Sequence, residues 1–488
     1  MSVTPTTEQS AVASTVLAPG QIMLVNAYAG TGKTETLRLI AEANQSKRLL
    51  YLSFNKQTAV KAKKRFPQNT DCRTIHSLAF RTVGNRYKDK LGNPTPRDVI
   101  QRFGVPQPYI AVLAIEVVTA YCHSTDRLLS ESHIEKRLQK KYPEVLPLAQ
   151  KIWAEMQDLG SRICMSHDGY LKLWSLGLPR ISADIIMLDE AQDTNPVTLK
   201  ILLDQRDNGS CSLVFVGDSH QAIYSWRKAI NSMEEVRESA DFIYPLTVSF
   251  RFHQQIATNA SKILNYYKGD PVHLIGHGPS TSPLPPFAVI GRCNGSLLAR
   301  ALPVVDRGGT VHFAGTTEKD HWDPYYLYEL QIPLDLLYLK QNQREAILTP
   351  QIRAFSDYKE VVDQIKGDGQ GAGIDKELEK HVKLVDEYGE RLPDLIDRLR
   401  RRSRSPETAD ISLSTAHRAK GLEWRRVEML DDFATLRNET ESDPFDSEYL
   451  EEINLIYVAM TRAAEAIEYP ADLIAWLGGR NQNDTGAH

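Results

Sequence analysis

The stretch that most constrains this chain is Asn26–Thr34, which reads Asn-Ala-Tyr-Ala-Gly-Thr-Gly-Lys-Thr. It follows the short apolar run 22–25 and precedes residues 35–40, which have the pattern of a helix. A strand, a glycine turn and a helix that begins with Gly-Lys-Thr are the setting of a phosphate-binding loop. Gly30 and Gly32 let the backbone N–H groups turn inward, and the new helix directs its positive end at the phosphates. The stretch therefore predicts a nucleotide site.

An acidic strand end further along the chain complements this loop. The apolar run 183–188 ends in the adjacent carboxylates Asp189 and Glu190. In a nucleotide site Lys33 reaches the β- and γ-phosphates, and the Thr34 hydroxyl and Asp189 hold Mg²⁺. Glu190 is placed to orient and deprotonate the attacking water. Together the two motifs predict hydrolysis of ATP or GTP, with nucleotide contacts from Ala29, Gly30, Thr31, Gly32, Lys33 and Thr34.

Composition excludes several other classes of protein. The 488-residue chain is long enough for three or four domains, and its five cysteines form no Cys-x-x-Cys pair. This argues against zinc ribbons, iron–sulfur clusters and disulfide frameworks, and it favours the reducing cytoplasm. No run of 18 apolar residues and no signal-peptide core are present, so we expect no membrane partner. The net charge is −4, so any nucleic-acid binding must come from a local groove.

The order of apolar runs indicates two α/β regions, each interrupted by helices. Strand-like runs alternate with helical segments up to about residue 81 and again from 183, which predicts a parallel sheet. The intervening segment 82–174 has helical periodicity, with no strand-like run. A second α/β region opens at 287–292, and 316–405 is helical again.

Several polar and aromatic residues follow strand ends, and their roles stay open at this level. Gln221 follows the apolar run 213–218 and can sense a γ-phosphate. Tyr224 and Trp226 fit core packing and base stacking equally well. The arginine cluster 398–404 is better explained as a solvated helix end than as a phosphate contact.

The motifs, taken together and in order, resemble one family. They are similar to those of superfamily-one DNA helicases of the UvrD/PcrA/Rep type, closest to the helicase core of the F-box DNA helicase branch, although no F-box is present. The resemblance spans residues 4 to about 470. It rests on Gln9, the phosphate loop, Thr-Ile-His-Ser (74–77), Asp-Glu-Ala-Gln-Asp (189–193), Gly-Asp-Ser-His-Gln-Ala-Ile-Tyr-Ser-Trp-Arg (217–227), Thr-Ala-His-Arg-Ala-Lys-Gly-Leu-Glu-Trp (415–424) and Tyr-Val-Ala-Met-Thr-Arg-Ala (457–463). Phe54-Asn55-Lys56, residues 167–172 and Asn454 indicate the branch.

This resemblance implies an α/β architecture of two RecA-like P-loop domains with parallel sheets, each with a mainly helical insertion. Domain 1A would comprise 1–81 and 175–250, split by insertion 1B at 82–174. Domain 2A would comprise 251–315 and 406–488, split by a short insertion 2B at 316–405. ATP would lie between the two sheets, and single-stranded DNA would cross their top.

The resemblance also implies a role for each matching residue. Gln9 would read adenine, Phe250 would stack on it, and Glu423 would bind the ribose. Catalysis would use Lys33, Glu190, the γ-phosphate sensor Gln221 and the arginine fingers Arg251 and Arg462. Phe54, Tyr224 and Trp226 would stack on DNA bases, with Thr74, His76, Thr415 and His417 near phosphates.

The function implied is an ATP- and Mg²⁺-dependent 3′-to-5′ translocase or helicase on single-stranded DNA and DNA junctions. Glu35 stands where many relatives have an arginine against adenine, and Tyr28 replaces a loop glycine. The short 2B segment leaves two rivals open. One is a translocase that strips proteins from DNA, and the other is a DNA-gated ATPase that signals to a partner such as a nuclease. A P-loop kinase or GTPase is disfavoured by Arg251, Arg462 and the tandem sheets.

Overall fold

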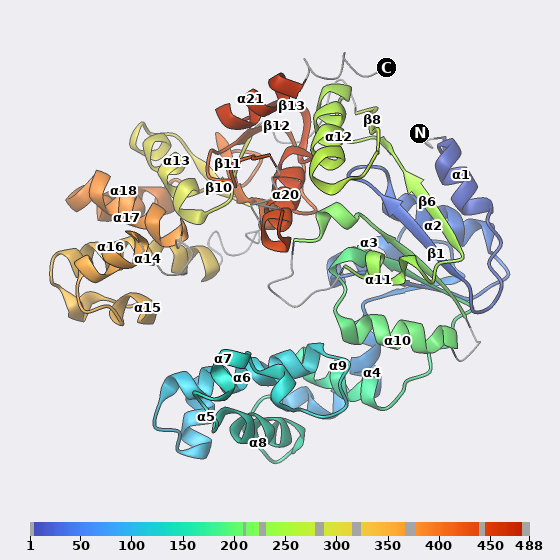
Figure 1. Ribbon diagram of the computed structural model, residues 1–488, viewed down its shortest axis with the longest axis horizontal. Coiled ribbons are helices and arrows are strands. Elements are labelled where there is room, and N and C mark those ends of the chain that lie inside the picture. The colour runs from blue at the N-terminus through green and yellow to red at the C-terminus, as the bar shows by residue number, and fades with distance from the viewer. Residues whose placement is uncertain are drawn as a thin grey trace. The chain divides into compact units, whose positions relative to one another are not determined.

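The protein consists of two compact units that divide between Leu246 and Thr247. The computed structural model describes residues 4–207, 211–223, 231–278, 287–314, 324–366, 376–438 and 445–480. Each unit is built around its own parallel sheet (Figure 1).

The first unit contains a six-stranded sheet in the order β3-β2-β4-β5-β1-β6, and all its strand pairings are parallel. Its four inner strands β2, β4, β5 and β1 are buried along almost their whole length and consist mostly of apolar residues, as covered parallel sheets require. The strands are β1 Ile22–Ala27, β2 Leu49–Leu52, β3 Thr70–Arg73, β4 Ile185–Asp189, β5 Ser212–Gly217 and β6 Phe242–Leu246. The helices beside them are α1 Thr7–Ser14, α2 Lys33–Ala43, α3 Lys56–Lys63, α4 Ile75–Thr82, α10 Pro196–Asp207 and α11 Ser232–Arg237.

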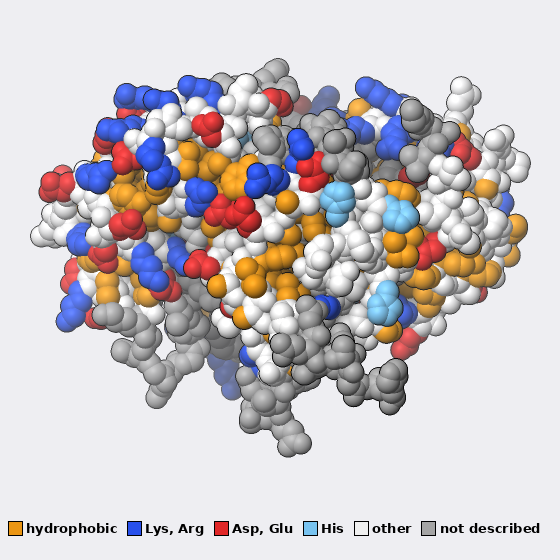
Figure 2. All heavy atoms as spheres, turned by 90° about the horizontal axis from the view of Figure 1, so that it is seen from above, with side chains coloured by type: hydrophobic (Ala, Val, Ile, Leu, Met, Phe, Trp, Pro, Cys, Tyr) orange, Lys and Arg blue, Asp and Glu red, His pale blue; other side chains and the backbone are white. Residues whose placement is uncertain are grey.

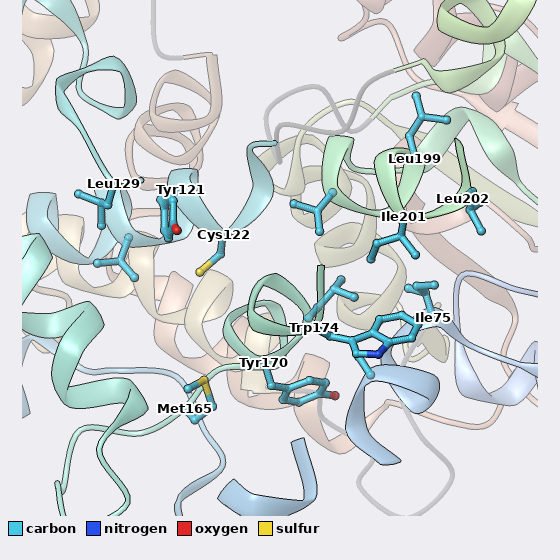
Figure 3. Close-up of a cluster of buried hydrophobic side chains, with 14 of the residues drawn as sticks. Ile75, Tyr121, Cys122, Leu129, Met165, Tyr170, Trp174, Leu199, Ile201 and Leu202 are labelled. Atoms are coloured by element: carbon cyan, nitrogen blue, oxygen red, sulfur yellow. The ribbon is translucent and has the colours of Figure 1, made fainter. Parts of the chain in front are cut away.

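A helical insertion separates α4 from β4. Its helices are α5 Pro96–Phe103, α6 Pro108–His123, α7 Lys136–Gln139, α8 Val145–Gln157 and α9 His167–Leu176. α7 is short, and a 3₁₀ turn over Glu131–His133 precedes it. Insertion and sheet share one hydrophobic core, in which Tyr170 and Trp174 of α9 lie with residues of α4, α6 and α10 (Figure 3). The insertion therefore packs onto the sheet unit as part of the same folded body.

The second unit contains a five-stranded parallel sheet in the order β10-β11-β9-β12-β13. The strands are β9 Ala288–Gly291, β10 Val311–Phe313, β11 Ile411–Thr415, β12 Trp424–Met429 and β13 Ala463–Glu468, and β7 Val248–Ser249 pairs separately with β8 Ile275–Gly276. The helices outside the insertion are α12 Gln254–Lys268, α13 Asn294–Asp306, α19 Ala416–Ala419, α20 Ser447–Met460 and α21 Ala471–Arg480. The predicted fold class, an α/β protein with two parallel sheets of the RecA-like type, is confirmed.

A second set of helices lies between β10 and β11. They are α14 Pro324–Lys340, α15 Pro350–Arg353, α16 Tyr358–Lys366, α17 Lys376–Tyr388 and α18 Leu392–Arg401. The apolar side of α18 is buried, whereas Arg398 is about half exposed and pairs with Asp306 and Asp394. This part of the arginine cluster is thus a helix end with carboxylate partners.

Charge is mixed over the surface. On the face shown in Figure 2, lysine and arginine side chains are interspersed with aspartate and glutamate. Among the described helices, no single one is long and apolar enough to cross a membrane; α5 and α6 meet the length and composition criteria only as a pair bent by 110°.

Candidate nucleotide and DNA site

The phosphate loop has the backbone that its glycines predicted. It connects β1 to α2, and Gly30 and Gly32 take left-handed φ angles of 75° and 84°. Gly32 is the N-cap of α2, so the first N–H groups of this helix are directed into the loop. A Cβ atom on Gly32 would lie 2.9 Å from Nε2 of Gln9, which leaves no room for a side chain there. The loop is therefore preformed for an anion.

Gln9 packs against this loop from α1. Its Oε1 accepts a hydrogen bond from the N–H of Thr6 (3.1 Å), and its Nε2 donates to the carbonyl of Thr31 (3.2 Å). The Thr6 hydroxyl accepts from the N–H of Gln9 in return, which completes a capping box. Both ends of the predicted adenine-reading amide are therefore engaged by the protein.

Asp189 lies at the carboxyl end of β4 and is almost fully buried. Its Oδ2 accepts hydrogen bonds from the Thr34 hydroxyl (2.9 Å) and the Tyr51 hydroxyl (2.7 Å). Burial, together with the negative charge of Glu190, raises the pKa of Asp189, and the Tyr51 hydrogen bond and the charge of Lys33 oppose this increase. A hydroxyl and a carboxylate this close together are the hard oxygen donors that Mg²⁺ prefers, so these residues fit the expected cation.

Glu190 is held in a strained and well-defined position. Its backbone is left-handed, with φ 53°, which is uncommon outside glycine and often marks functional sites. Oε1 lies 3.5 Å from Nζ of Lys33, and Oε2 accepts a 2.7 Å hydrogen bond from Nε2 of Gln192. The carboxylate expected to activate water is therefore next to the lysine expected to contact the phosphates.

A buried polar chain continues from Gln192 to the next strand. Oε1 of Gln192 accepts from the N–H of Asp218 (3.1 Å), and Oδ2 of Asp218 accepts from Nε2 of Gln221 (2.7 Å). A Cβ atom on Gly217 would lie 2.4 Å from Oε1 of Gln192, so a side chain here would displace the Gln192 amide. The structure thus connects the predicted γ-phosphate sensor Gln221 to Glu190.

The residues that differ from the family pattern have partners of their own. Glu35 accepts hydrogen bonds from Arg38 and Arg65, and the bond from Arg38 lowers the pKa of Glu35. Tyr28 is buried, and its ring stacks on His220 with 5.8 Å between centroids. Tyr28 is thus accommodated within the unit.

In the second unit, three of the predicted nucleotide residues come together. Nε of Arg251 donates to Oε2 of Glu423 (2.7 Å), and Nη1 donates to the carbonyl of Thr461 (3.2 Å). Arg462 is 1% exposed and donates to the carbonyls of Val458 and Leu422. The predicted arginine fingers and the predicted ribose ligand are therefore neighbours within one unit, close to the half-buried Phe250.

Three of the predicted DNA contacts lie beside β2 and β3. Phe54 follows β2 and is 56% exposed, which is unusual for a large apolar side chain. Thr74 caps α4 by accepting from the N–H of Ser77, and His76 is the second residue of the same helix. In the second unit Thr415 caps α19 in the same way, and His417 lies within that helix. Tyr224 and Trp226 lie outside the described residues.

A cavity of 240 Å³ connects the carboxylates to Phe54 and His76 within the first unit. Asp189 and Glu190 line it on one side, and Asp168 and His123 on another. The full lining is Leu52, Ser53, Phe54, Ile75, His76, His123, Asp168, Leu188, Asp189, Glu190, Asp193, Thr194, Asn195 and Thr198. Predicted DNA residues and predicted hydrolytic residues therefore line one cavity.

Asp168 joins the helical insertion to this cavity. Its two carboxylate oxygens lie 3.1 Å from Nε2 of His76 and 3.0 Å from Nε2 of His123. Burial alone would raise the pKa of Asp168, but the hydrogen bonds from the two histidines outweigh it and hold the pKa well below its usual range. Four residues further along α9, Lys172 donates to the carbonyls of Ser124 and Asp126. Lys172 belongs to the segment 167–172 that indicated the helicase branch, and its hydrogen bonds hold the C-terminal end of α6 in place.

The comparisons with known proteins agree with this arrangement. The model of the AAA domain matches residues 8–227, and the model of the UvrD-like helicase C-terminal domain matches residues 340–467. The chain carries a UvrD-like superfamily-one helicase core. It is 30% identical to F-box DNA helicase 1 of Gallus gallus, over 95% of this chain and 48% of that protein. It is 29% identical to F-box DNA helicase protein 1 of Schizosaccharomyces pombe, over 95% of this chain and 57% of that protein. The helicase core therefore spans about half the length of these relatives.

Some site residues escaped prediction from sequence. Tyr51, Gln192, Asp218 and His123 received no role, although each contacts a predicted site residue. Gln192 and Asp218 belong to the motifs 189–193 and 217–227, so their positions near the site could have been predicted from the sequence. Tyr51 and His123 carry no local signal, because their contacts depend on which strands and helices become neighbours.

Proposed function

We propose that this helicase core hydrolyses ATP and uses the energy to move 3′ to 5′ along single-stranded DNA, separating duplex DNA as it moves. The main support is the 240 Å³ cavity in which Phe54 and His76 face the same space as Asp189 and Glu190. A DNA base that displaces Phe54 or His76 acts on the walls of the cavity that also contains the hydrolytic carboxylates. A change at the DNA-contacting residues can therefore reach the hydrolytic carboxylates through the walls of one cavity.

The hydrolytic step follows from the contacts of the first unit. Main-chain N–H groups of the phosphate loop and the Lys33 ammonium neutralise the phosphates, and Glu190 accepts a proton from the attacking water. Thr34 and Asp189 are suited to hold Mg²⁺, which supplies positive charge at the phosphate oxygens. Gln192 fixes the direction of the Glu190 carboxylate, so the base is oriented before ATP binds.

The arginines of the second unit complete the proposal. We assign to Arg251 and Arg462 the neutralisation of charge that develops during phosphoryl transfer, as arginine fingers do. Arg251 must exchange its partner Glu423 for phosphate, and this exchange releases Glu423 to accept a ribose hydroxyl. The direction of movement and the stacking roles of Phe54, Tyr224 and Trp226 come from the sequence resemblance.

The test is ATP turnover with and without single-stranded DNA. We expect strong stimulation by DNA that is lost in Glu190→Gln, whereas Glu238→Gln, an exposed acidic residue of the same unit, behaves as wild type. Equal turnover with and without DNA would contradict the coupling.

Polarity is tested separately with duplexes that carry a 3′ or a 5′ single-stranded tail. Preferential displacement from the 3′ tail supports helicase action. DNA-stimulated turnover with length-dependent translocation but without strand displacement would instead assign the core to protein removal. DNA-stimulated turnover without length dependence would assign it to a DNA-gated switch for a partner such as a nuclease.

A further inference from the structure

A cluster of metal-binding side chains lies in the helical insertion of the second unit. Glu377 and His381 are four residues apart on α17, which places them on one face of that helix. Glu329 comes from α14, which packs against α17. One ligand atom from each of the three side chains lies within 4.8 Å of the others. No function assigned above uses these residues.

Two of the three side chains are buried, and one carboxylate oxygen of the cluster has no hydrogen-bond partner among the described residues. His381 is fully buried and Glu329 is 8% exposed. Oε2 of Glu329 is inaccessible to solvent and has no hydrogen-bond partner in the part of the chain that the structure describes. An isolated buried carboxylate is costly, because it loses hydration without replacement. Burial, with the neighbouring Glu377, accordingly raises the pKa of Glu329 to about 7. The cluster therefore includes a buried carboxylate oxygen that no described residue satisfies.

The other two side chains are held in place by the backbone. The Glu377 carboxylate accepts hydrogen bonds from the N–H groups of Gly295 (2.9 Å) and Asn294 (3.0 Å) at the start of α13. Nδ1 of His381 lies 2.9 Å from the carbonyl oxygen of Glu377 and 3.8 Å from its Oε1. Such outer contacts orient metal ligands and fix the imidazole ring. Two of the three candidate ligands are thus positioned before any ion arrives.

We propose that Glu329, Glu377 and His381 bind one divalent transition-metal ion, zinc or manganese. One imidazole and two carboxylates are a donor set that suits these ions. Ligand atoms around tetrahedral zinc are about 3.3 Å apart at metal–ligand distances of about 2.0 Å, so the side chains need to close by about 1.5 Å at most. The ion offsets the repulsion between the two carboxylates and gives Glu329 the partner that it lacks.

The expected role of the ion is structural. It connects α14 to α17 and, through Glu377, to the start of α13, which directly follows β9. An ion at this position therefore stabilises the junction between the helical insertion and the sheet of the second unit. This inference does not depend on the proposed function, because neither ATP nor DNA takes part.

The first test is titration of the full chain, freed of metal with a chelator, with zinc chloride and manganese chloride in the absence of nucleotide. We expect one tightly bound ion per chain and a higher thermal unfolding temperature. Glu329→Gln, which keeps the size of the side chain, should weaken binding by more than the roughly 10- to 100-fold that loss of an outer-shell partner costs. Glu387→Gln, an exposed residue on the same helix, should bind as wild type.

Two further measurements decide the location. Asp189→Asn removes the candidate cation ligand of the first unit and should leave the ion bound. Cobalt(II) bound to the wild-type chain should show visible bands of a nitrogen- and oxygen-ligated ion, which tests the site even if Glu329→Gln does not fold. Absence of binding, with a higher unfolding temperature for Glu329→Gln, would overturn the proposal in favour of a protonated carboxyl pair. Undiminished binding in Glu329→Gln would also overturn it.

Discussion

Replacing Lys172 with methionine should change how stability depends on pH. The Lys172 side chain is almost completely buried, and its Nζ donates to the carbonyls of Ser124 (2.7 Å) and Asp126 (2.6 Å). The ammonium also lies 4.3 Å from the centre of the Tyr121 ring. Methionine keeps the apolar stem but removes the donor, so both carbonyls lose this hydrogen bond. Below pH 8 we expect the variant to be less stable by about 1–3 kcal/mol.

The pH dependence follows from the same burial. Burial lowers the pKa of Lys172 from 10.5 to about 8. Between these values the unfolded chain still binds a proton that the folded chain has released, so the wild type gains stability as pH rises. At 1.36 kcal/mol per pH unit, the gain approaches about 3 kcal/mol at full burial and is smaller where solvent screens the charge. The methionine variant lacks this gain, and the stability difference between the two proteins should widen by about 1–3 kcal/mol.

The assay is urea unfolding followed by helical circular dichroism at about pH 7, 8, 9 and 10. Subtracting the variant from the wild type removes the contribution of every other titrating group. Lys151→Met, an exposed lysine on α8, is the matched control and should show a difference that does not change with pH. A difference for Lys172→Met that is equally flat would refute the reasoning, because it would mean that Lys172 stays protonated in the folded chain throughout this range.

Three further predictions concern the first unit. Tyr51→Phe removes a buried hydrogen bond to Asp189 and should cost about 1.5–3 kcal/mol, seen as a lower unfolding temperature in calorimetry; an unchanged temperature would contradict it. Gly217→Ala should lower kcat about 100-fold with little change in ATP affinity, because its Cβ displaces Gln192; steady-state kinetics test this, and wild-type turnover would exclude it. Asp168→Asn should lower stability at neutral pH by about 1 kcal/mol; since the folded pKa of Asp168 is depressed, the wild-type advantage should be complete above about pH 4 and shrink progressively as pH falls below that value towards the folded pKa, which acid unfolding of both proteins measures.

The phosphate loop and the two parallel sheets were predictable because their signals are local. Gly30 and Gly32 adopt the left-handed angles that the loop demands, and the apolar runs became buried strands. Contacts between distant segments were not predictable in the same way. Tyr51 reaches Asp189 only because β2 lies beside β4, and those residues are 138 positions apart.

Other residues were predicted at the site, but without the partners that the fold gives them. Arg251 pairs with Glu423 across 172 positions, a contact that follows from the folding of the second unit. The capped helix that begins at His167 carries Asp168 between two histidines, and nothing in the sequence indicated these contacts. Contacts of this kind between distant side chains depend on tertiary packing, so a single sequence hardly indicates them.

The capping box of Gln9 makes the start of α1 a competitor for the nucleotide base. If the Gln9 amide turns from Thr6 or Thr31 towards an adenine, it gives up a contact that holds the start of α1, and a lost helix cap costs about 1 kcal/mol. Recognition of the base at this position is therefore an exchange of partners, with a small net gain. The N-terminal helix should loosen when a purine nucleotide occupies the loop, so a fusion or truncation before Thr6 would alter nucleotide preference from outside the site.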